Sequence, residues 1–151
     1  MRAVCGPGLT SSWHGPLDVT PEFRVPATGS AAFGGEICGN TIYDFGGSAG
    51  NYTANCNGTA VITPGAGQLL QIQGNWTLFF GDVLTIYDGA GTGGTVLYTS
   101  TAGGPVNVIT SVPDAPVTIG FTSDGSFESV GFDLTVTCLS PCSGTPNAGT
   151  T

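Results

Sequence analysis

The sequence predicts an all-β domain, a sandwich of two antiparallel sheets, and three observations support this class. Only 8% of the residues are charged and 26 are glycine, which suits short strands and tight turns better than helices. Apolar and polar residues alternate with a period of two, as at Val117, Ile119 and Phe121. Segments of this kind recur about every eight to twelve residues, with Gly, Pro and Asp between them, which is typical of a sandwich or barrel.

The chain divides into three parts. Residues 1–35 contain both arginines and the only histidine and lack a clear periodicity, so we expect an N-terminal arm. Residues 36–138 carry the strand pattern, and their length suits one hydrophobic core. Residues 139–151 are rich in Ser, Thr, Pro and Gly and are expected to form a short tail.

Nine strands are expected in the central domain, separated by turn signals such as Pro64-Gly65, Asp88-Gly89 and Asp124-Gly125. The expected strands cover residues 41–43, 59–63, 68–73, 76–80, 83–87, 95–99, 106–110, 117–121 and 132–137. Their alternation predicts a buried core made of Ile62, Leu70, Ile72, Leu84, Ile86, Ile119, Phe121, Phe132 and Leu134.

The charge of the chain limits its partners. Ten Asp and Glu oppose Arg2 and Arg24, so the net charge is −8. Between Glu36 and Cys138 there is no Lys, Arg or His, so the acids there must be solvated, accept hydrogen bonds or hold a cation. Because phosphate binding depends on Lys and Arg, nucleic acid is excluded as a partner class and an anionic membrane surface is disfavoured. No apolar run is long enough to predict membrane insertion.

The cysteine content indicates an oxidising compartment. Five cysteines in a small domain are typical of disulfide-bonded secreted or cell-surface proteins. Because five is odd, one thiol is expected to stay free or to pair with another chain. The five are Cys5, Cys38, Cys56, Cys138 and Cys142.

Several motifs in this order resemble the CUB domain pattern. They are residues 81–89 (GDVLTIYDG), 121–126 (FTSDGS) and 131–134 (GFDL). Upstream, residues 43–47 (YDFGG) and 50–52 (GNY), followed by Cys56, resemble the opening of CUB-like modules of secreted bacterial proteins.

The resemblance covers about Glu36 to Cys138. It implies a jelly-roll-like sandwich of about ten strands, which agrees with the strand count from periodicity. It also implies an extracellular, non-enzymatic module that recognises proteins or glycans.

The resemblance implies a calcium site as well. Many CUB domains bind calcium with a Tyr, a Glu, two Asp and a Ser, which correspond here to Tyr52, no residue, Asp82, Asp124 and Ser126. Calcium prefers six to eight oxygens, so two carboxylates without the third would form a weak site. The alternative interpretation is that Asp82 caps a turn and Asp124 initiates one through its side chain.

Two kinds of covalent modification are expected. The resemblance implies a disulfide between Cys38 and Cys56, and closing that loop would contribute about 3 kcal/mol. The sequons at Asn51, Asn57 and Asn75 could carry glycans in a eukaryotic host, although a chain rich in Asn and Thr also produces sequons by chance.

Catalysis is not expected. An acyl-transfer triad needs a base beside its nucleophile, and the only histidine, His14, lies in the arm. A glycosidase needs two opposed carboxylates, which Asp82 and Asp124 could nominally supply, but acids in loops are more often turn formers.

Self-association into a homopolymer is the function that we expect. The arm contains short apolar alternations, Leu17 with Val19 and Phe23 with Val25, that lie outside the nine-strand pattern and could add a strand to the edge of a neighbouring sheet. Arg24 and Arg2 would then meet carboxylates of the next subunit. Head-to-tail contacts of this kind produce filaments, so we expect a subunit of an extracellular fibre or surface appendage.

Two alternatives remain open. The arm could be a flexible linker. The domain could instead be a protein- or glycan-binding module, with or without calcium, of a larger secreted protein.

Overall fold

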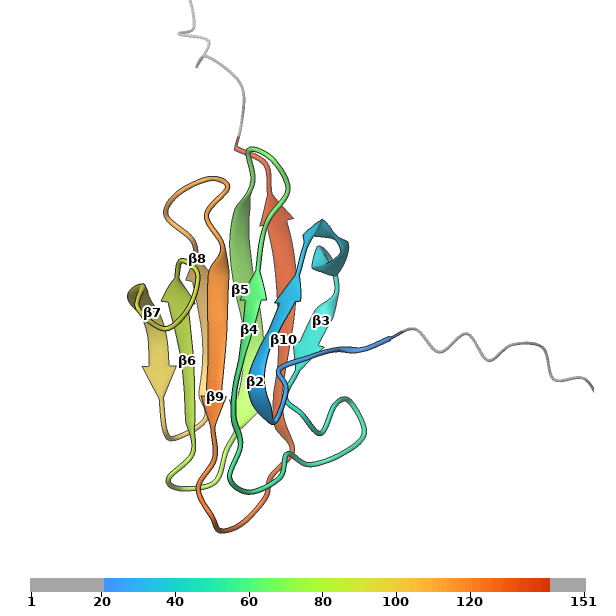
Figure 1. Cartoon of the computed structure of the whole chain (residues 1–151), viewed down its shortest axis with the longest axis vertical. Helices are drawn as coiled ribbons and strands as arrows, with labels where there is room; N and C mark the ends of the chain where they lie inside the picture. Colours follow the sequence, from blue (N-terminus) through green and yellow to red (C-terminus); the bar gives the residue numbers. More distant parts are fainter. Residues whose placement is uncertain (1–20, 142–151) are drawn as a thin grey trace, which may run out of the picture.

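A computed structural model describes residues 21–141, which form a two-sheet β-sandwich (Figure 1). The strands are β1 (Phe23–Arg24), β2 (Thr28–Phe33), β3 (Thr41–Tyr43), β4 (Asn57–Ile62), β5 (Leu69–Thr77), β6 (Val83–Asp88), β7 (Thr95–Ser100), β8 (Gly104–Ile109), β9 (Val117–Thr122) and β10 (Gly131–Leu139). One 3-10 turn, η1 (Gly35–Ile37), precedes β3. Sheet A has the order β1-β3-β10-β5-β8, and sheet B has the order β2-β4-β9-β6-β7.

The predicted sandwich is confirmed, but its sheets are mixed and not wholly antiparallel. All central neighbours are antiparallel, whereas β1 lies parallel to β3 and β2 lies parallel to β4. The chain crosses from sheet A to sheet B directly after β1. Strands β1 and β2 thus form one edge of each sheet, and each runs in the same direction as the strand beside it. None of the described residues forms a helix long and apolar enough to cross a membrane.

The predicted core is confirmed in full. All nine predicted side chains are at most 2% exposed and lie between the sheets. Tyr52, Phe121 and Phe132 form a row of edge-to-face contacts, with ring centroids 5.0 and 5.6 Å apart. Burial of each large apolar side chain contributes roughly 1.5–3 kcal/mol, so this row helps to fix how the sheets pack.

The predicted boundary between arm and domain at residue 36 is wrong. Residues 23–33 form β1 and β2, one in each sheet. Phe23 packs edge-to-face on Phe33 with ring centroids 5.3 Å apart, and Val25 is completely buried. The sequence did not predict β2 because its Thr-Gly-Ser-Ala-Ala stretch has low β propensity. These residues form a strand because they pair with β4.

The two strands expected at 68–73 and 76–80 are one strand, β5. Gly74 suggested a break, but β5 runs through it beside β10. A Cβ atom at Gly74 would collide with the carbonyl oxygen of Asp133, so the glycine allows two strands to approach closely. Strand β5 ends at Thr77, which leaves residues 78–80 in the next loop.

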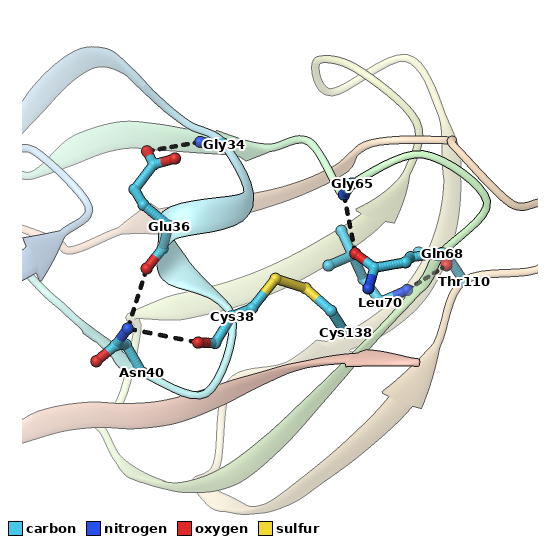
Figure 2. The surroundings of a disulfide bond; sticks show 9 residues. All are labelled: Gly34, Glu36, Cys38, Asn40, Gly65, Gln68, Leu70, Thr110 and Cys138. Carbon is cyan, nitrogen blue, oxygen red and sulfur yellow. Dashed lines mark hydrogen bonds between the residues drawn. A yellow bond between two sulfur atoms is a disulfide. The ribbon is translucent and has the colours of Figure 1, made fainter. Parts of the chain in front are cut away.

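The disulfide joins Cys38 to Cys138, so the predicted pairing of Cys38 with Cys56 is wrong (Figure 2). Thr41 in β3 pairs with Thr135 in β10, which brings the cysteines just beyond them to a Cα separation of 5.4 Å. Cys56 is a buried free thiol in the described part of the chain, at the opposite end of the sandwich.

Side-chain hydrogen bonds support the backbone around this disulfide (Figure 2). The Glu36 carboxylate accepts from the Gly34 N–H at 2.8 Å, and the Asn40 amide donates to the Glu36 carbonyl at 3.0 Å. Directly after β8, the Thr110 hydroxyl accepts from the Leu70 N–H of β5 at 2.9 Å. We call this region, made of residues 34–40, 64–70, 110–115 and 136–139, the disulfide end.

Candidate functional site

Three loops meet at the other end of the sandwich, at the bottom of Figure 1. They are residues 44–56 between β3 and β4, residues 78–82 between β5 and β6, and residues 123–130 between β9 and β10, and together we call them the loop end. Backbone hydrogen bonds connect the first and third loops, from the Asn55 N–H to the Asp124 carbonyl at 2.8 Å and from the Tyr52 N–H to the Ser129 carbonyl at 3.2 Å. The loops therefore form one continuous surface.

The structure brings the four residues of the expected calcium site together at the loop end. The Tyr52 hydroxyl donates to Asp82 Oδ2, and the Asp124 N–H donates to Asp82 Oδ1 at 2.8 Å. Asp124 Oδ1 in turn accepts from the N–H and the hydroxyl of Ser126, at 2.8 and 3.0 Å. Asp82 is completely buried while Asp124 and Ser126 are exposed, so the chain of contacts runs from the core to the surface.

Tyr52 is the buried anchor of this network. Its hydroxyl oxygen also accepts from the Phe79 N–H at 3.0 Å, which ties the first loop to the second. Burial, together with the hydrogen bond to Asp82, raises the pKa of Tyr52 to about 12. The phenol therefore stays protonated at neutral pH and donates to the buried carboxylate of Asp82.

The geometry shows Asp124 acting as a turn former, because its side chain accepts from a backbone N–H two residues further along the chain. Within residues 21–141, no group of three or more His, Cys, Asp and Glu side chains is placed to hold a metal ion. The carboxylate that the CUB resemblance lacks is therefore not supplied by another part of the described fold. Asp82, Asp124 and Ser126 offer fewer oxygens than calcium normally takes.

Sequence reasoning missed the aromatic side chains at the loop end. Phe79, Phe80 and Phe127 are 44%, 91% and 67% exposed, and the Phe79 and Phe127 rings stack with centroids 4.7 Å apart. The sequence did contain one signal for these exposed rings. Two adjacent phenylalanines, Phe79 and Phe80, interrupt the alternation of apolar and polar residues directly before Gly81.

Phe127 has an unusual backbone conformation. Its φ of 60° lies in the left-handed region, which costs about 1–2 kcal/mol for a residue with a side chain. Strained positions of this kind are concentrated at functional sites. Here the conformation places an apolar ring in solvent against Phe79.

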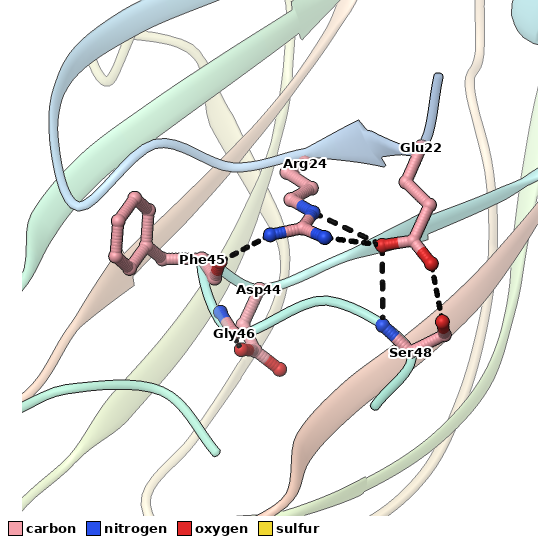
Figure 3. Close-up of polar contacts among 6 residues, drawn as sticks. All are labelled: Glu22, Arg24, Asp44, Phe45, Gly46 and Ser48. Carbon is pink, nitrogen blue, oxygen red and sulfur yellow. Dashed lines mark hydrogen bonds and ion pairs between the residues drawn. The ribbon is translucent and has the colours of Figure 1, made fainter. Parts of the chain in front are cut away.

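The residues expected to drive assembly have partners within the chain (Figure 3). Arg24 forms an ion pair with Glu22 at 2.7 Å and donates to the Phe45 carbonyl at 3.2 Å. Glu22 also accepts from the N–H and the hydroxyl of Ser48. The hydrogen bond from the Ser48 hydroxyl, followed by that from Arg24 and then that from the Ser48 N–H, lowers the pKa of Glu22. Phe23 and Val25 pack in the domain as described above, so the expectation that they belong to a free arm is wrong. Contact of Arg24, whose side chain is 45% exposed, with another subunit stays a prediction. Leu17 and Val19 lie outside the described residues.

Asp44 holds the start of the loop of residues 44–56 in place through hydrogen bonds to its buried side chain (Figure 3). Its buried carboxylate accepts from the Gly46 N–H at 2.7 Å and from the Phe132 N–H at 3.0 Å. Burial raises the pKa of Asp44, although these two hydrogen bonds act in the opposite direction. Asp44 thus connects the first loop to the start of β10.

All three sequon asparagines, Asn51, Asn57 and Asn75, are exposed.

Comparison with family models and with curated proteins finds no match for this sequence.

Proposed function

We propose that this chain is a non-enzymatic, CUB-like extracellular module that binds a protein ligand through its loop end. The observation that carries the proposal is the exposed aromatic cluster of Phe79, Phe80 and Phe127. Exposed aromatic patches are typical of interaction sites, and covering one such ring contributes roughly 1.5–3 kcal/mol. The motif resemblance and the disulfide, which fits an oxidising compartment, support the extracellular assignment.

The charge of the loop end favours a basic ligand. Asp124 and Glu128 flank Phe127 and are exposed, and no Lys, Arg or His occurs between Glu36 and Cys138. A ligand with Lys or Arg beside an apolar side chain would satisfy both the carboxylates and the aromatic faces. We therefore expect a basic segment of another protein to bind here.

We further propose that the same loops bind calcium only weakly, because their side chains offer fewer oxygens than the ion normally takes. The ion would be held by Asp82, Asp124 and Ser126, with Tyr52 orienting Asp82. When bound, it would supply positive charge that fixes the second and third loops against each other.

Selection from a random peptide library tests the proposal. Peptides displayed on phage and selected on the full chain should be enriched in Lys or Arg next to apolar residues. Their binding should fall at least about tenfold for the Phe80→Ser and Phe127→Ser variants, because each removes an apolar anchor. The matched control is Val112→Ser, since Val112 is 56% exposed but lies at the disulfide end. Equal binding to all variants, or no enrichment of basic peptides, would contradict the proposal.

Head-to-tail assembly is a second candidate function, and the outer edge of β2 favours it. Among the four outer strands, β1 has two residues, β7 carries an irregularity in its pairing with β6, and β8 contains Pro105. Strand β2 has six residues and lacks a charge or a proline, so it has none of these protective features. A strand from a second copy could pair there.

Removal of residues 1–20 tests assembly separately from peptide binding. If Leu17 and Val19 supply the added strand, the full chain should form polymers in negative-stain micrographs and the shortened chain should be monomeric. A monomeric full chain, or identical polymers from both chains, would exclude this role for the segment.

A further inference from the structure

A groove crosses the outer face of sheet B, beginning beside the loop end. It has a volume of about 340 Å³, within the range of about 300–1,000 Å³ typical of small-ligand sites. Its floor is Gly120, in the middle of the central strand β9, and its sides come from β4, β6 and the loop that joins β6 to β7. The side chains that give it polar character are Asn57, Thr59, Thr85, Tyr87, Thr92 and Thr122.

Gly120 has no structural requirement to be glycine. Its backbone is not in the left-handed region, and an added Cβ atom would make ordinary contacts, at 3.4 Å from the Tyr87 ring and 3.9 Å from the Thr59 methyl group. Gly74 in β5 and Gly58 in β4 differ, because a Cβ atom at either would collide with a carbonyl oxygen. Glycine weakens the interior of a strand and often marks the close approach of a ligand.

The loop at one end of the groove is held in a fixed position. The Thr118 hydroxyl lies on the outer face of β9, accepts from the Gly91 N–H and donates to the Gly89 carbonyl, both at 2.8 Å. These bonds hold residues 89–92 over the sheet and bury Thr118 completely. Thr92 therefore forms an end wall of the groove.

We infer that this groove binds a short neutral oligosaccharide. No charged residue lines it, although the chain carries a net charge of −8, so it offers no counter-ion to a charged ligand and repels an anion. The Thr85 hydroxyl already bonds Thr99 and the Thr59 hydroxyl donates to the Gly29 carbonyl, so the hydroxyls of Thr92 and Thr122 are the ones that can both donate to and accept from a sugar. The Tyr87 ring offers an apolar surface to the C–H face of a sugar. A peptide strand fits less well, because the backbone groups of β4, β9 and β6 are already paired with one another.

The test uses the full chain produced in the bacterial periplasm, where the disulfide forms and Asn57 stays unmodified. The probes are neutral hexasaccharides of the β-1,4-glucose, β-1,3-glucose, mannose and N-acetylglucosamine series, with a heparin hexasaccharide as the anionic contrast. At millimolar concentration, at least one neutral probe should shift the amide NMR signals of residues 85–87 and 120–122. Heparin should leave them unchanged.

Filling the groove should separate binding from folding. Gly120→Ala should keep or raise the melting temperature, because a Cβ atom fits there, while it weakens binding. Gly120→Val fills more of the groove and should weaken binding by about tenfold or more. The control is Thr135→Val, on the outer face of sheet A, which should bind as the unaltered chain does. Absence of shifts with every neutral probe, stronger shifts with heparin, or unchanged binding by both Gly120 variants would overturn the inference. Phe79, Phe80 and Phe127 are unaltered throughout, so these results are independent of the function proposed for the loop end.

Discussion

The two ends of the sandwich are held together in different ways. At the disulfide end, a covalent bond between Cys38 and Cys138 joins the segment before β3 to β10, and backbone groups are capped by Glu36 and Asn40. At the loop end, three loops depend on the hydrogen-bonded network of Tyr52, Asp82 and Asp124.

The two ends also differ in the size of the apolar side chains that they expose to solvent. The loop end exposes the large rings of Phe79, Phe80 and Phe127, whereas the exposed hydrophobic residues near the disulfide end are the smaller Val112 and Ile109. The disulfide end is thus fixed by a covalent bond and by capped backbone groups. The loop end uses buried polar groups to present aromatic side chains to solvent.

Breaking the disulfide should have the largest effect on stability. In the chain-entropy model, closing a loop of about 100 residues contributes about 4.7 kcal/mol, and Cys38 and Cys138 are 100 residues apart. The Cys38→Ala, Cys138→Ala double variant should lose stability on this scale in urea unfolding. The control, Cys56→Ala, should lose much less. Peptide mapping that finds Cys38 bonded to Cys56 would contradict the structure.

Calcium should stabilise the loop end if the proposed site forms. At a free concentration 100 times the dissociation constant, binding adds about 2.7 kcal/mol to the free energy of unfolding. Thermal melts with calcium and with chelator should then differ for the unaltered chain and coincide for Asp124→Asn. If the unaltered chain melts at the same temperature with millimolar calcium and with chelator, calcium binding is contradicted. Asp124 then acts only as a turn former.

Removing the Tyr52 hydroxyl should destabilise the loop end even without calcium. Tyr52→Phe leaves the buried Asp82 carboxylate and the Phe79 N–H each without one partner, which costs about 1–3 kcal/mol. The matched control is Tyr43→Phe, because Tyr43 lies on the outer face of sheet A and outside the network. Equal unfolding free energies for the two variants would show that the network contributes nothing.

The Tyr52 hydroxyl should also make stability depend on pH in the alkaline range. The folded-state pKa of Tyr52 is about 12, against 10.0 for an ordinary tyrosine, so the folded chain holds this proton more tightly than the unfolded chain. The resulting stability is complete below pH 10 and is lost as the pH rises toward 12. The unaltered chain should therefore lose more stability over this interval than Tyr52→Phe. Parallel curves would mean that Tyr52 titrates normally.

The core was predictable because alternation directly reports which side chains face the opposite sheet. The same signal was absent from β2, whose small residues become a strand only through β4, and in β5 it was interrupted by the missing side chain of Gly74. The disulfide could not be derived from spacing along the chain. Which cysteines meet depends on the pairing of β3 with β10, which no local pattern specifies.

The candidate site was predictable only in part. The motifs at Tyr52, Asp82, Asp124 and Ser126 located the loop end correctly. Phe79, Phe80 and Phe127 were missed because apolar residues in a sequence are expected to be buried. Only the end of β5 at Thr77 shows that two of these rings lie in a loop.

The most direct test of the account is to map where a selected basic peptide binds. In an NMR titration of the full chain, the amide signals of residues 78–82 and 123–130 should shift, and those of residues 34–40 and 136–139 should stay unchanged. This result would establish the loop end as the binding surface. Shifts centred on the disulfide end, or on the outer edge of β2, would contradict the central claim.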